Sequence, residues 1–242
     1  GQLWGNPVYR WDVLKESGYA LWVKRIGHNL KLFHLIRLDH FRGFVAYWEV
    51  PAGEDTAING KWVEVPVMDF FNTLLQKFPN LPIIAEDLGL ITPDVREVMD
   101  HFGIPGMKLL LFAFGNELST HPYAPHNYTQ NCVVYSGTHD NNTIEGWFKS
   151  EATPEDKIRL FKYIGREVQE NELHWDLIRL AMMSVANSVI IPLQDLLGLG
   201  AEARMNLPAT SKRNWEWRIR PEQLTPSLTE KLREVTEIYG RA

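Results

Sequence analysis

Short apolar runs rich in Ile, Val and Leu alternate along the chain with longer stretches in which apolar residues recur every three or four positions. The short runs are typical of buried strands, and the longer stretches are typical of amphipathic helices. The predicted strands are Ile36–Leu38, Leu81–Ala85, Met107–Phe114, Cys132–Tyr135 and Val189–Leu193. The predicted helices are Trp11–Leu35, Asp69–Phe78, a helix beginning at Pro93, Pro154–Glu170, His174–Ala186 and Pro226–Tyr239.

Three of the helices begin with the same dipeptide, at Thr92-Pro93, Thr153-Pro154 and Thr225-Pro226. We expect each threonine hydroxyl to accept an N–H of the first helical turn, while the proline has no N–H to leave unpaired. Residues 51–65 are polar and contain glycine, and their length predicts a functional loop.

The alternation of strands and helices predicts an α/β fold with a parallel sheet. A doubly wound sheet is the alternative, but no Gly-rich phosphate loop follows any predicted strand. The chain opens on the aromatic loop GQLWGNPVYRW without a methionine, so we expect a fragment whose N-terminal part is missing. We therefore predict a (β/α)8 TIM barrel of which this chain supplies about the last five β/α units. Residues 1–242 would form the C-terminal part of a single catalytic domain.

Composition narrows the range of partners. The formal net charge is −5 and no dense Lys/Arg stripe is present, which argues against nucleic acid. No apolar run approaches the ~20 residues that a membrane helix needs, so we expect no membrane partner. The single cysteine, Cys132, is typical of a reducing compartment, which predicts the cytoplasm or, in a plant, the plastid stroma.

Three acidic residues, Asp39, Glu86 and Asp140, each stand just after a predicted strand. The C-terminal ends of parallel barrel strands converge on one mouth, so the three carboxylates would meet around one substrate. Glycoside chemistry needs one carboxylate as a nucleophile and another carboxyl group as a proton donor. This arrangement therefore favours a carbohydrate-active enzyme.

The neighbours of the first two acids suggest different roles. Strand alternation places Arg37 on the same face as Asp39, where it would favour the ionised form that a nucleophile needs. Asp87 adds like charge beside Glu86 and favours the protonated form that a general acid needs. A structural Arg–Asp pair and a salt bridge at a helix start are the alternatives.

Asp140 lies in a polar cluster with His139, Asn141 and Asn142, which could bind sugar hydroxyls. The same residues also commonly form turns, so this motif alone does not distinguish a sugar-binding cluster from an ordinary turn. The eight histidines form no metal-binding pattern, and Ser136 lacks a nucleophile-elbow sequence. We expect no metal and no cofactor.

The motifs RLDHFRGF, IIAEDLG and GTHDNNT resemble those of α-glucan-active barrels. GQLWGNPVYRW, GIPGMKLLLFAF and ARMNLPATSKRNWEWR look more specifically like the 4-α-glucanotransferase family of glycoside hydrolase family 77, also called amylomaltases or disproportionating enzymes. The resemblance runs from residue 1 to about residue 220 in six ordered motifs.

The resemblance implies a role for each matched position. Asp39 would be the nucleophile, Glu86 the general acid/base, and Asp140 the carboxylate that binds hydroxyls of the distorted sugar. Arg37 and His139 would hold the nucleophile and the sugar at the cleavage site. The positions that would lie near the donor and acceptor subsites are Gln2, Trp4, His40, Asp87, Phe112 and Asn206.

The resemblance also implies α-1,4-glucans as partners, namely maltooligosaccharides, amylose, glycogen or starch, together with the missing N-terminal part of the same polypeptide. The reaction would transfer a glucan segment to another glucan or glucose with retention, which predicts a separation of ~5–5.5 Å between the carboxyl groups of Asp39 and Glu86. Two alternatives stay open: a retaining α-glucan hydrolase of the α-amylase type, and a catalytically silent glucan-binding fragment.

Overall fold

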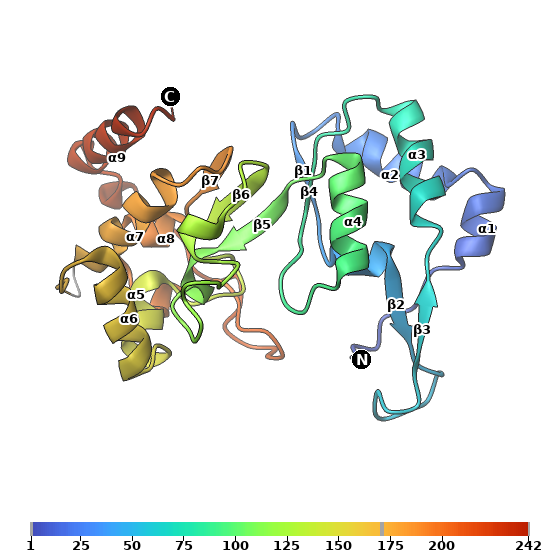
Figure 1. The fold of residues 1–242 in the computed structure, drawn as a ribbon, viewed down its shortest axis with the longest axis horizontal. Helices are drawn as coiled ribbons and strands as arrows, with labels where there is room; N and C mark the ends of the chain where they lie inside the picture. The colour runs from blue at the N-terminus through green and yellow to red at the C-terminus, as the bar shows by residue number, and fades with distance from the viewer. Residues whose placement is uncertain (1, 170–171, 242) are drawn as a thin grey trace. The chain divides into compact units, whose positions relative to one another are not determined.

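The computed structural model describes residues 2–169 and 172–241, which form two compact units, Gly1–Met107 and Lys108–Ala242 (Figure 1). The strands are β1 (Ile36–Leu38), β2 (Ala46–Glu49), β3 (Lys61–Glu64), β4 (Ile83–Ala85), β5 (Gly106–Leu109), β6 (Cys132–Tyr135) and β7 (Ser188–Ile190). The helices are α1 (Trp11–Glu16), α2 (Ala20–Asn29), α3 (Val67–Lys77), α4 (Pro93–Phe102), α5 (Ile144–Ser150), α6 (Pro154–Ile164), α7 (Leu173–Met182), α8 (Leu193–Leu196) and α9 (Pro226–Ile238).

The first unit is organised around two parallel strands, β1 and β4, with Leu38 directly opposite Ala85. Helices α2 and α3 contribute aromatic side chains to the core of this unit. Trp22 meets Phe44 edge-on with ring centroids 5.1 Å apart, and Phe44 stacks on Phe70 at 5.7 Å. These buried rings belong to one hydrophobic core together with aliphatic side chains of the strands and helices, such as Leu38 and Leu74.

An antiparallel hairpin follows β1 in the first unit and extends away from the parallel strands (Figure 1). It pairs β2 with β3, and Trp48 lies opposite Trp62. The sequence predicted a loop over residues 51–65, and this prediction was wrong for its last part, which is strand β3. The aromatic cross-strand pair explains the difference, because such pairs stabilise a hairpin even where the flanking residues are polar.

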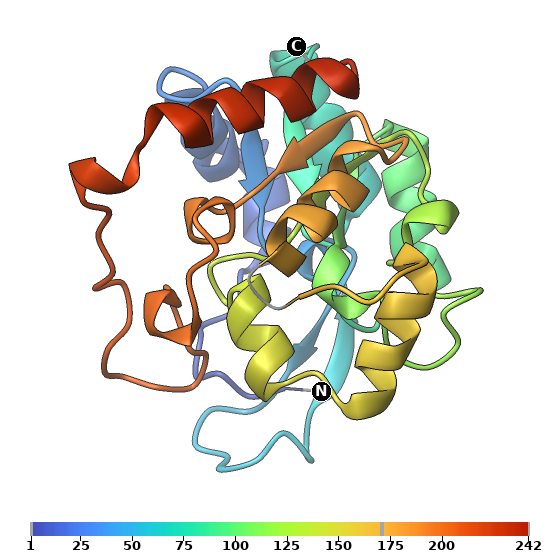
Figure 2. The same cartoon turned by 90° about the vertical axis from the view of Figure 1, so that its left-hand side faces the viewer.

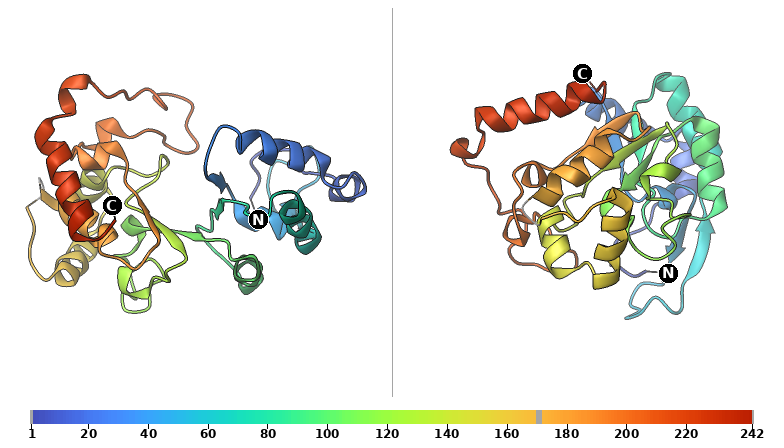
Figure 3. Two further views of the ribbon diagram at one scale, coloured as in Figure 1. Left: turned by 90° about the horizontal axis from the view of Figure 1, so that it is seen from above. Right: turned by 60° about the vertical axis from the view of Figure 1, so that its left-hand side comes forward.

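In the second unit, β6 and β7 run parallel, and they belong to a three-stranded sheet in the order β5, β6, β7. Leu160, Leu173 and Leu177 are fully buried beside this sheet. Helix α9 lies along α7 (Figures 2 and 3), and the two helices share a small core that includes Ile178 and Val235.

The predicted helix Trp11–Leu35 is divided into α1 and α2. The break falls at Gly18 and Tyr19, whose φ angles are +60° and +54°. A left-handed residue other than glycine costs roughly 1–2 kcal/mol. Tyr19 is fully buried and its hydroxyl donates to Asp69 at 2.6 Å, so tertiary packing offsets this cost.

Other predicted elements differ mainly in their ends. The strand predicted over Met107–Phe114 stops at Leu109 and continues as a 3₁₀ turn, Leu110–Phe112. Helix α6 ends at Ile164 because Gly165 adopts a positive φ, and residue 170 of the predicted range lies outside the described residues. Helices α5 and α8 were not predicted, since each is too short to show a clear apolar period.

The prediction of an α/β fold with parallel strand pairs is confirmed, because β1 pairs with β4 and β6 pairs with β7 in parallel register. Within the described residues, every helix is too short or too polar to cross a membrane.

Candidate active site

The end of β1 carries the first predicted catalytic residue. Arg37 Nη2 lies 2.7 Å from Asp39 Oδ1, which is the ion pair expected from strand alternation. The Asp39 side chain is 75% exposed, whereas that of Arg37 is 28% exposed. Arg37 also directs its Nε toward Met107 Sδ at 3.2 Å. A half-buried guanidinium therefore orients a carboxylate that is open to a ligand.

Glu86 follows β4 and is tied to the end of β1 through its backbone. Its N–H donates to Leu38 O at 2.9 Å, and its carbonyl accepts the N–H of Phe41 at 2.9 Å. Because Leu38 and Ala85 are register partners, Asp39 and Glu86 occupy equivalent positions at neighbouring strand ends.

The Glu86 carboxylate is held by two backbone donors. His40 N–H donates to Oε2 at 2.7 Å, and Leu88 N–H donates to Oε1 at 2.8 Å. His40 adopts a left-handed conformation, with φ 47° and ψ 57°, at the start of the 3₁₀ turn that follows β1. The residue next to Asp39 thus supplies a donor to Glu86, and one hydrogen bond couples the two predicted catalytic positions.

Asp87 has a different partner from Glu86. Its Oδ1 accepts the N–H of Met107 at 2.6 Å, which ties β4 to the start of β5. A Cβ on Gly106 would lie 2.6 Å from Asp87 Oδ2, so only glycine leaves room for this contact. This hydrogen bond from Met107 to Asp87 aligns β4 with β5. The contact was not predicted from the sequence, which had suggested only that the charge of Asp87 acts on Glu86.

Two further residues named from the sequence form a pair of their own. Trp4 Nε1 donates to Gln2 Oε1 at 3.0 Å in the segment before α1, and Trp4 is 65% exposed. Phe112, in the second unit, is 42% exposed and packs edge-on against Tyr123 with centroids 5.6 Å apart. These aromatic faces have the character of sugar-stacking surfaces.

The loop after β6 holds the third predicted carboxylate, Asp140. Asn206 Nδ2 donates to its Oδ1 at 2.6 Å, and His139 Nε2 lies 3.3 Å from its Oδ2. Asn206 N–H also donates to His139 O at 3.0 Å. Of the four predicted site residues in the second unit, His139, Asp140 and Asn206 therefore lie together, whereas Phe112 packs against Tyr123.

Arg204 also belongs to this cluster, although the sequence did not predict it as a site residue. Its Nη2 donates to Asp140 O at 2.7 Å, and its Nη1 lies 3.2 Å from Glu151 Oε1. The sequence also did not predict Trp215, whose ring centroid is 5.2 Å from that of His139. Arg204 and Trp215 both lie in the motif that suggested the family, ARMNLPATSKRNWEWR, but only Asn206 of this motif was assigned a role.

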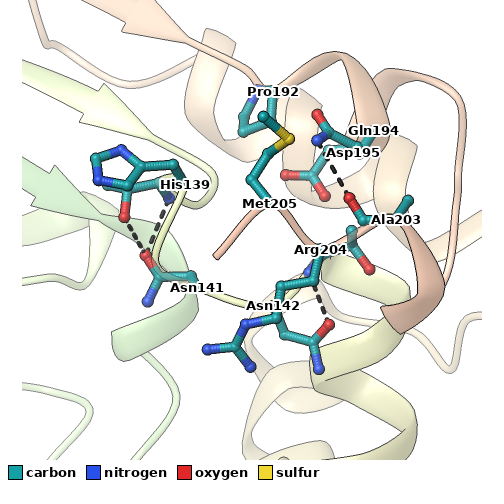
Figure 4. Close-up of a pocket in the computed structure, with 11 residues that line it drawn as sticks. His139, Asn141, Asn142, Pro192, Gln194, Asp195, Ala203, Arg204 and Met205 are labelled. Atoms are coloured by element: carbon teal, nitrogen blue, oxygen red, sulfur yellow. Dashed lines mark hydrogen bonds between the residues drawn. The ribbon is translucent and has the colours of Figure 1, made fainter. Parts of the chain in front are cut away.

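A pocket of about 190 Å³ lies beside this loop in the second unit (Figure 4). Asp195 lines it from α8 and is 1% exposed. Burial raises the pKa of Asp195 to about 6, although hydrogen bonds from Ile144 N–H and the Ser136 hydroxyl oppose the shift. Asp195 lies on α8, shortly after β7 ends, so a search for acidic residues that follow strands could have found it.

Among the residues that the structure describes, no group of three or more His, Cys, Asp or Glu side chains is placed to hold a metal ion. The expectation that the chemistry needs no metal or cofactor stays a prediction.

The family model of 4-alpha-glucanotransferases matches residues 1–225. This chain belongs to the 4-alpha-glucanotransferase family. It is 51% identical to a 4-alpha-glucanotransferase of Synechocystis over its whole length and 48% of that protein. It is 45% identical to the chloroplastic/amyloplastic 4-alpha-glucanotransferase of Solanum tuberosum, of which it covers 42%.

A solved structure agrees with the sequence comparisons. The amylomaltase from Streptococcus agalactiae in complex with acarbose superposes with a TM-score of 0.94 at 40% identity, covering all of this chain and 48% of that one. The chain thus spans about half the length of the relatives that it matches.

Proposed function

We propose that the polypeptide containing this chain is a 4-α-glucanotransferase that moves α-1,4-glucan segments to another glucan or to glucose. The observation that carries the proposal is the pairing of Asp39 and Glu86 at the ends of adjacent parallel strands, coupled through His40 N–H. Retaining transfer needs a nucleophile and an acid/base on the two sides of one glycosidic bond. Membership of the family supports the choice of this reaction.

In the proposed mechanism, Glu86 protonates the glycosidic oxygen while Asp39 attacks the anomeric carbon and the C–O bond breaks. The leaving glucan departs with that proton. The 4-hydroxyl of an acceptor then attacks the glycosyl–Asp39 ester, and Glu86 takes the hydroxyl proton as the new bond forms. Arg37, at 2.7 Å, orients Asp39 for both steps.

The second unit supplies sugar-binding groups in this proposal. Asp140 would bind ring hydroxyls at the cleavage site, with His139 and Asn206 holding it in place. Gln2, Trp4, His40, Asp87 and Phe112 are proposed to line the donor and acceptor subsites. The acarbose complex of the Streptococcus agalactiae amylomaltase supports a substrate of this kind.

We further infer that the chain contributes about the last five β/α units of a (β/α)8 barrel and belongs to a single catalytic domain. Coverage of about half of each relative supports an N-terminal partner segment in the same polypeptide. The single, buried Cys132 supports a reducing compartment such as the cytoplasm. The chloroplastic/amyloplastic name of the potato relative supports the plastid stroma if the source is a plant.

The test is product analysis with maltotriose, using the full-length polypeptide. Transfer yields glucose together with oligomers longer than maltotriose, whereas a retaining hydrolase yields only glucose and maltose. Asp39→Asn and Glu86→Gln should each reduce turnover, by about 10⁴-fold for the nucleophile. Asp12→Asn is the matched control, because it breaks another exposed Asp–Arg pair of the first unit, with Arg10 at 2.6 Å.

Three results would contradict the proposal. The first is an active enzyme that releases only glucose and maltose, which would indicate hydrolysis. The second is an Asp39→Asn variant that keeps as much activity as Asp12→Asn. The third is a folded full-length polypeptide with no activity on maltotriose, which would favour the silent glucan-binding alternative.

A further inference from the structure

The buried carboxylate of Asp195 bonds to both ends of the loop that carries His139 and Asp140. Ser136 Oγ, at the end of β6, donates to Asp195 Oδ2 at 2.7 Å. Ile144 N–H, at the start of α5, donates to Asp195 Oδ1 at 2.8 Å. Residues 137–143 lie between these two donors, so a single side chain closes the loop at its base.

The loop has little other freedom once its ends are joined. Asn141 Oδ1 accepts both the N–H and the hydroxyl of Thr138, at 2.9 and 2.7 Å. At Asp140 itself, Arg204 donates to the backbone carbonyl and Asn206 donates to the carboxylate. Asp195 therefore holds the base of the loop through Ser136 and Ile144, while Arg204 and Asn206 hold its tip.

Burying the Asp195 carboxylate costs free energy, because the charged group loses its contact with water. Asp195 and Ser136 are almost fully buried, and a carboxylate in that position is stable only when its oxygens are well bonded. An apolar side chain of similar size would fill the same volume at lower cost. The two donors that Asp195 uses are the residues that flank the Asp140 loop, which points to a role in the site.

We propose that Asp195 is a positioning residue, which sets the place of the Asp140 carboxylate by closing the loop 137–143 through Ser136 and Ile144. This inference rests on the proposed glucan transfer, in which Asp140 binds hydroxyls of the distorted sugar. Asp195 makes no contact with the reacting atoms in this account. Its effect is on the transition state, because that is where Asp140 binds most strongly.

The test compares Ser136→Ala with Ser150→Ala in the full-length polypeptide. Both changes remove a hydroxyl that donates one hydrogen bond of 2.7 Å in the second unit, but the bond from Ser150 goes to the Gly146 carbonyl within its own helix. Ser136→Ala should lower kcat for maltotriose disproportionation by about tenfold or more, with KM changed by less than about threefold. Ser150→Ala should keep both constants within about twofold of wild type.

Asp195→Asn serves as the conservative variant, because its amide oxygen can accept from Ile144 N–H while its NH₂ group donates to Ser136 Oγ. Asp195→Asn should therefore keep more of kcat than Asp195→Ala. If Asp195→Ala does not fold, the comparison of Ser136→Ala with Ser150→Ala tests the inference without it. Equal kcat values for Ser136→Ala and Ser150→Ala would overturn the inference while the proposed function stands. An inactive wild-type enzyme would overturn the proposed function, and the inference with it.

Discussion

At the scale of single residues, backbone donors hold the proposed catalytic carboxylates in place as much as side chains do. His40 adopts a left-handed conformation that costs roughly 1–2 kcal/mol for a residue other than glycine, and its N–H reaches Glu86 Oε2. The sequence predicted the Arg37–Asp39 pair because side chains alternate along a strand. It could not predict the His40 contact, because a single left-handed residue leaves no periodic signal.

A second residue of interest is His174, which is buried on α7 next to Glu145. Its Nδ1 lies 3.6 Å from Glu145 Oε1. Burial lowers the pKa of His174 to about 4, the charge of Lys231 lowers it further, and Asp176 opposes the shift. The folded chain therefore keeps this imidazole neutral at pH values where an unfolded chain would protonate it.

This shift gives a pH-dependent stability. Above pH 6.5 the histidine is neutral in both states and has no effect. As the pH falls from about 6.5 toward 4, the unfolded state binds a proton that the folded state does not, so stability is lost. At pH 5 the loss is on the order of 2 kcal/mol.

His174→Gln should therefore reduce the difference in the free energy of unfolding between pH 7 and pH 5. Urea unfolding of the full-length polypeptide at the two pH values measures this difference. Asp195, whose pKa is raised to about 6, contributes a slope of opposite sign over much of the same range, but it does so equally in wild type and variant. A variant that keeps the full wild-type pH dependence would exclude His174 as its source.

At the scale of secondary-structure elements, the three Thr-Pro starts show how far a local signal reaches. Each helix begins where the dipeptide predicts. Thr153 and Thr225 accept a backbone N–H as expected, from Asp156 and Leu228. Thr92 instead bonds to the side chains of Arg42 and Asp94. The proline is sufficient to mark the helix start, while tertiary neighbours decide what the hydroxyl binds.

Thr153→Ala should destabilise α6 by about 1 kcal/mol, because Thr153 and Asp156 form a reciprocal capping box. Hydrogen exchange of the α6 amides, compared with the amides of α7, measures the local free energy of opening. Thr153→Ser should restore most of the protection because it keeps the accepting oxygen. Equal exchange in the alanine and serine variants would mean that the cap contributes nothing.

Much of the fold could be predicted from the sequence, because helix periodicity and helix starts leave local patterns in it. Long apolar periods and proline starts predicted where α3, α4, α6, α7 and α9 begin, to within two residues, whereas α6 and α7 end earlier than predicted. The β2–β3 hairpin was missed because its stability comes from the cross-strand pair Trp48 and Trp62, which no local pattern reveals. The contacts of Asp195 could not be predicted, because its two partners lie 51 and 59 positions away in the chain.

At the scale of the whole molecule, the chain supplies two compact units, each with parallel strands whose C-terminal ends bear acidic residues. Asp39 and Glu86 belong to the first unit, and Asp140 belongs to the second. Because the chain spans about half of each relative, the groove that presents a glucan would be completed by the rest of the polypeptide. The account therefore predicts that activity requires the full-length polypeptide.

The central claim is that Asp39 forms a covalent bond to the transferred sugar and that Glu86 drives its release. The most direct test incubates the full-length Glu86→Gln variant with a maltotriosyl fluoride, whose leaving group needs no proton. Because acceptor attack lacks its base, the glycosyl-enzyme should accumulate. Intact-mass analysis should then show one maltotriosyl group per chain, and peptide mapping should place it on Asp39. A label on a peptide without Asp39, or no label on a variant that still consumes the fluoride, would contradict the account.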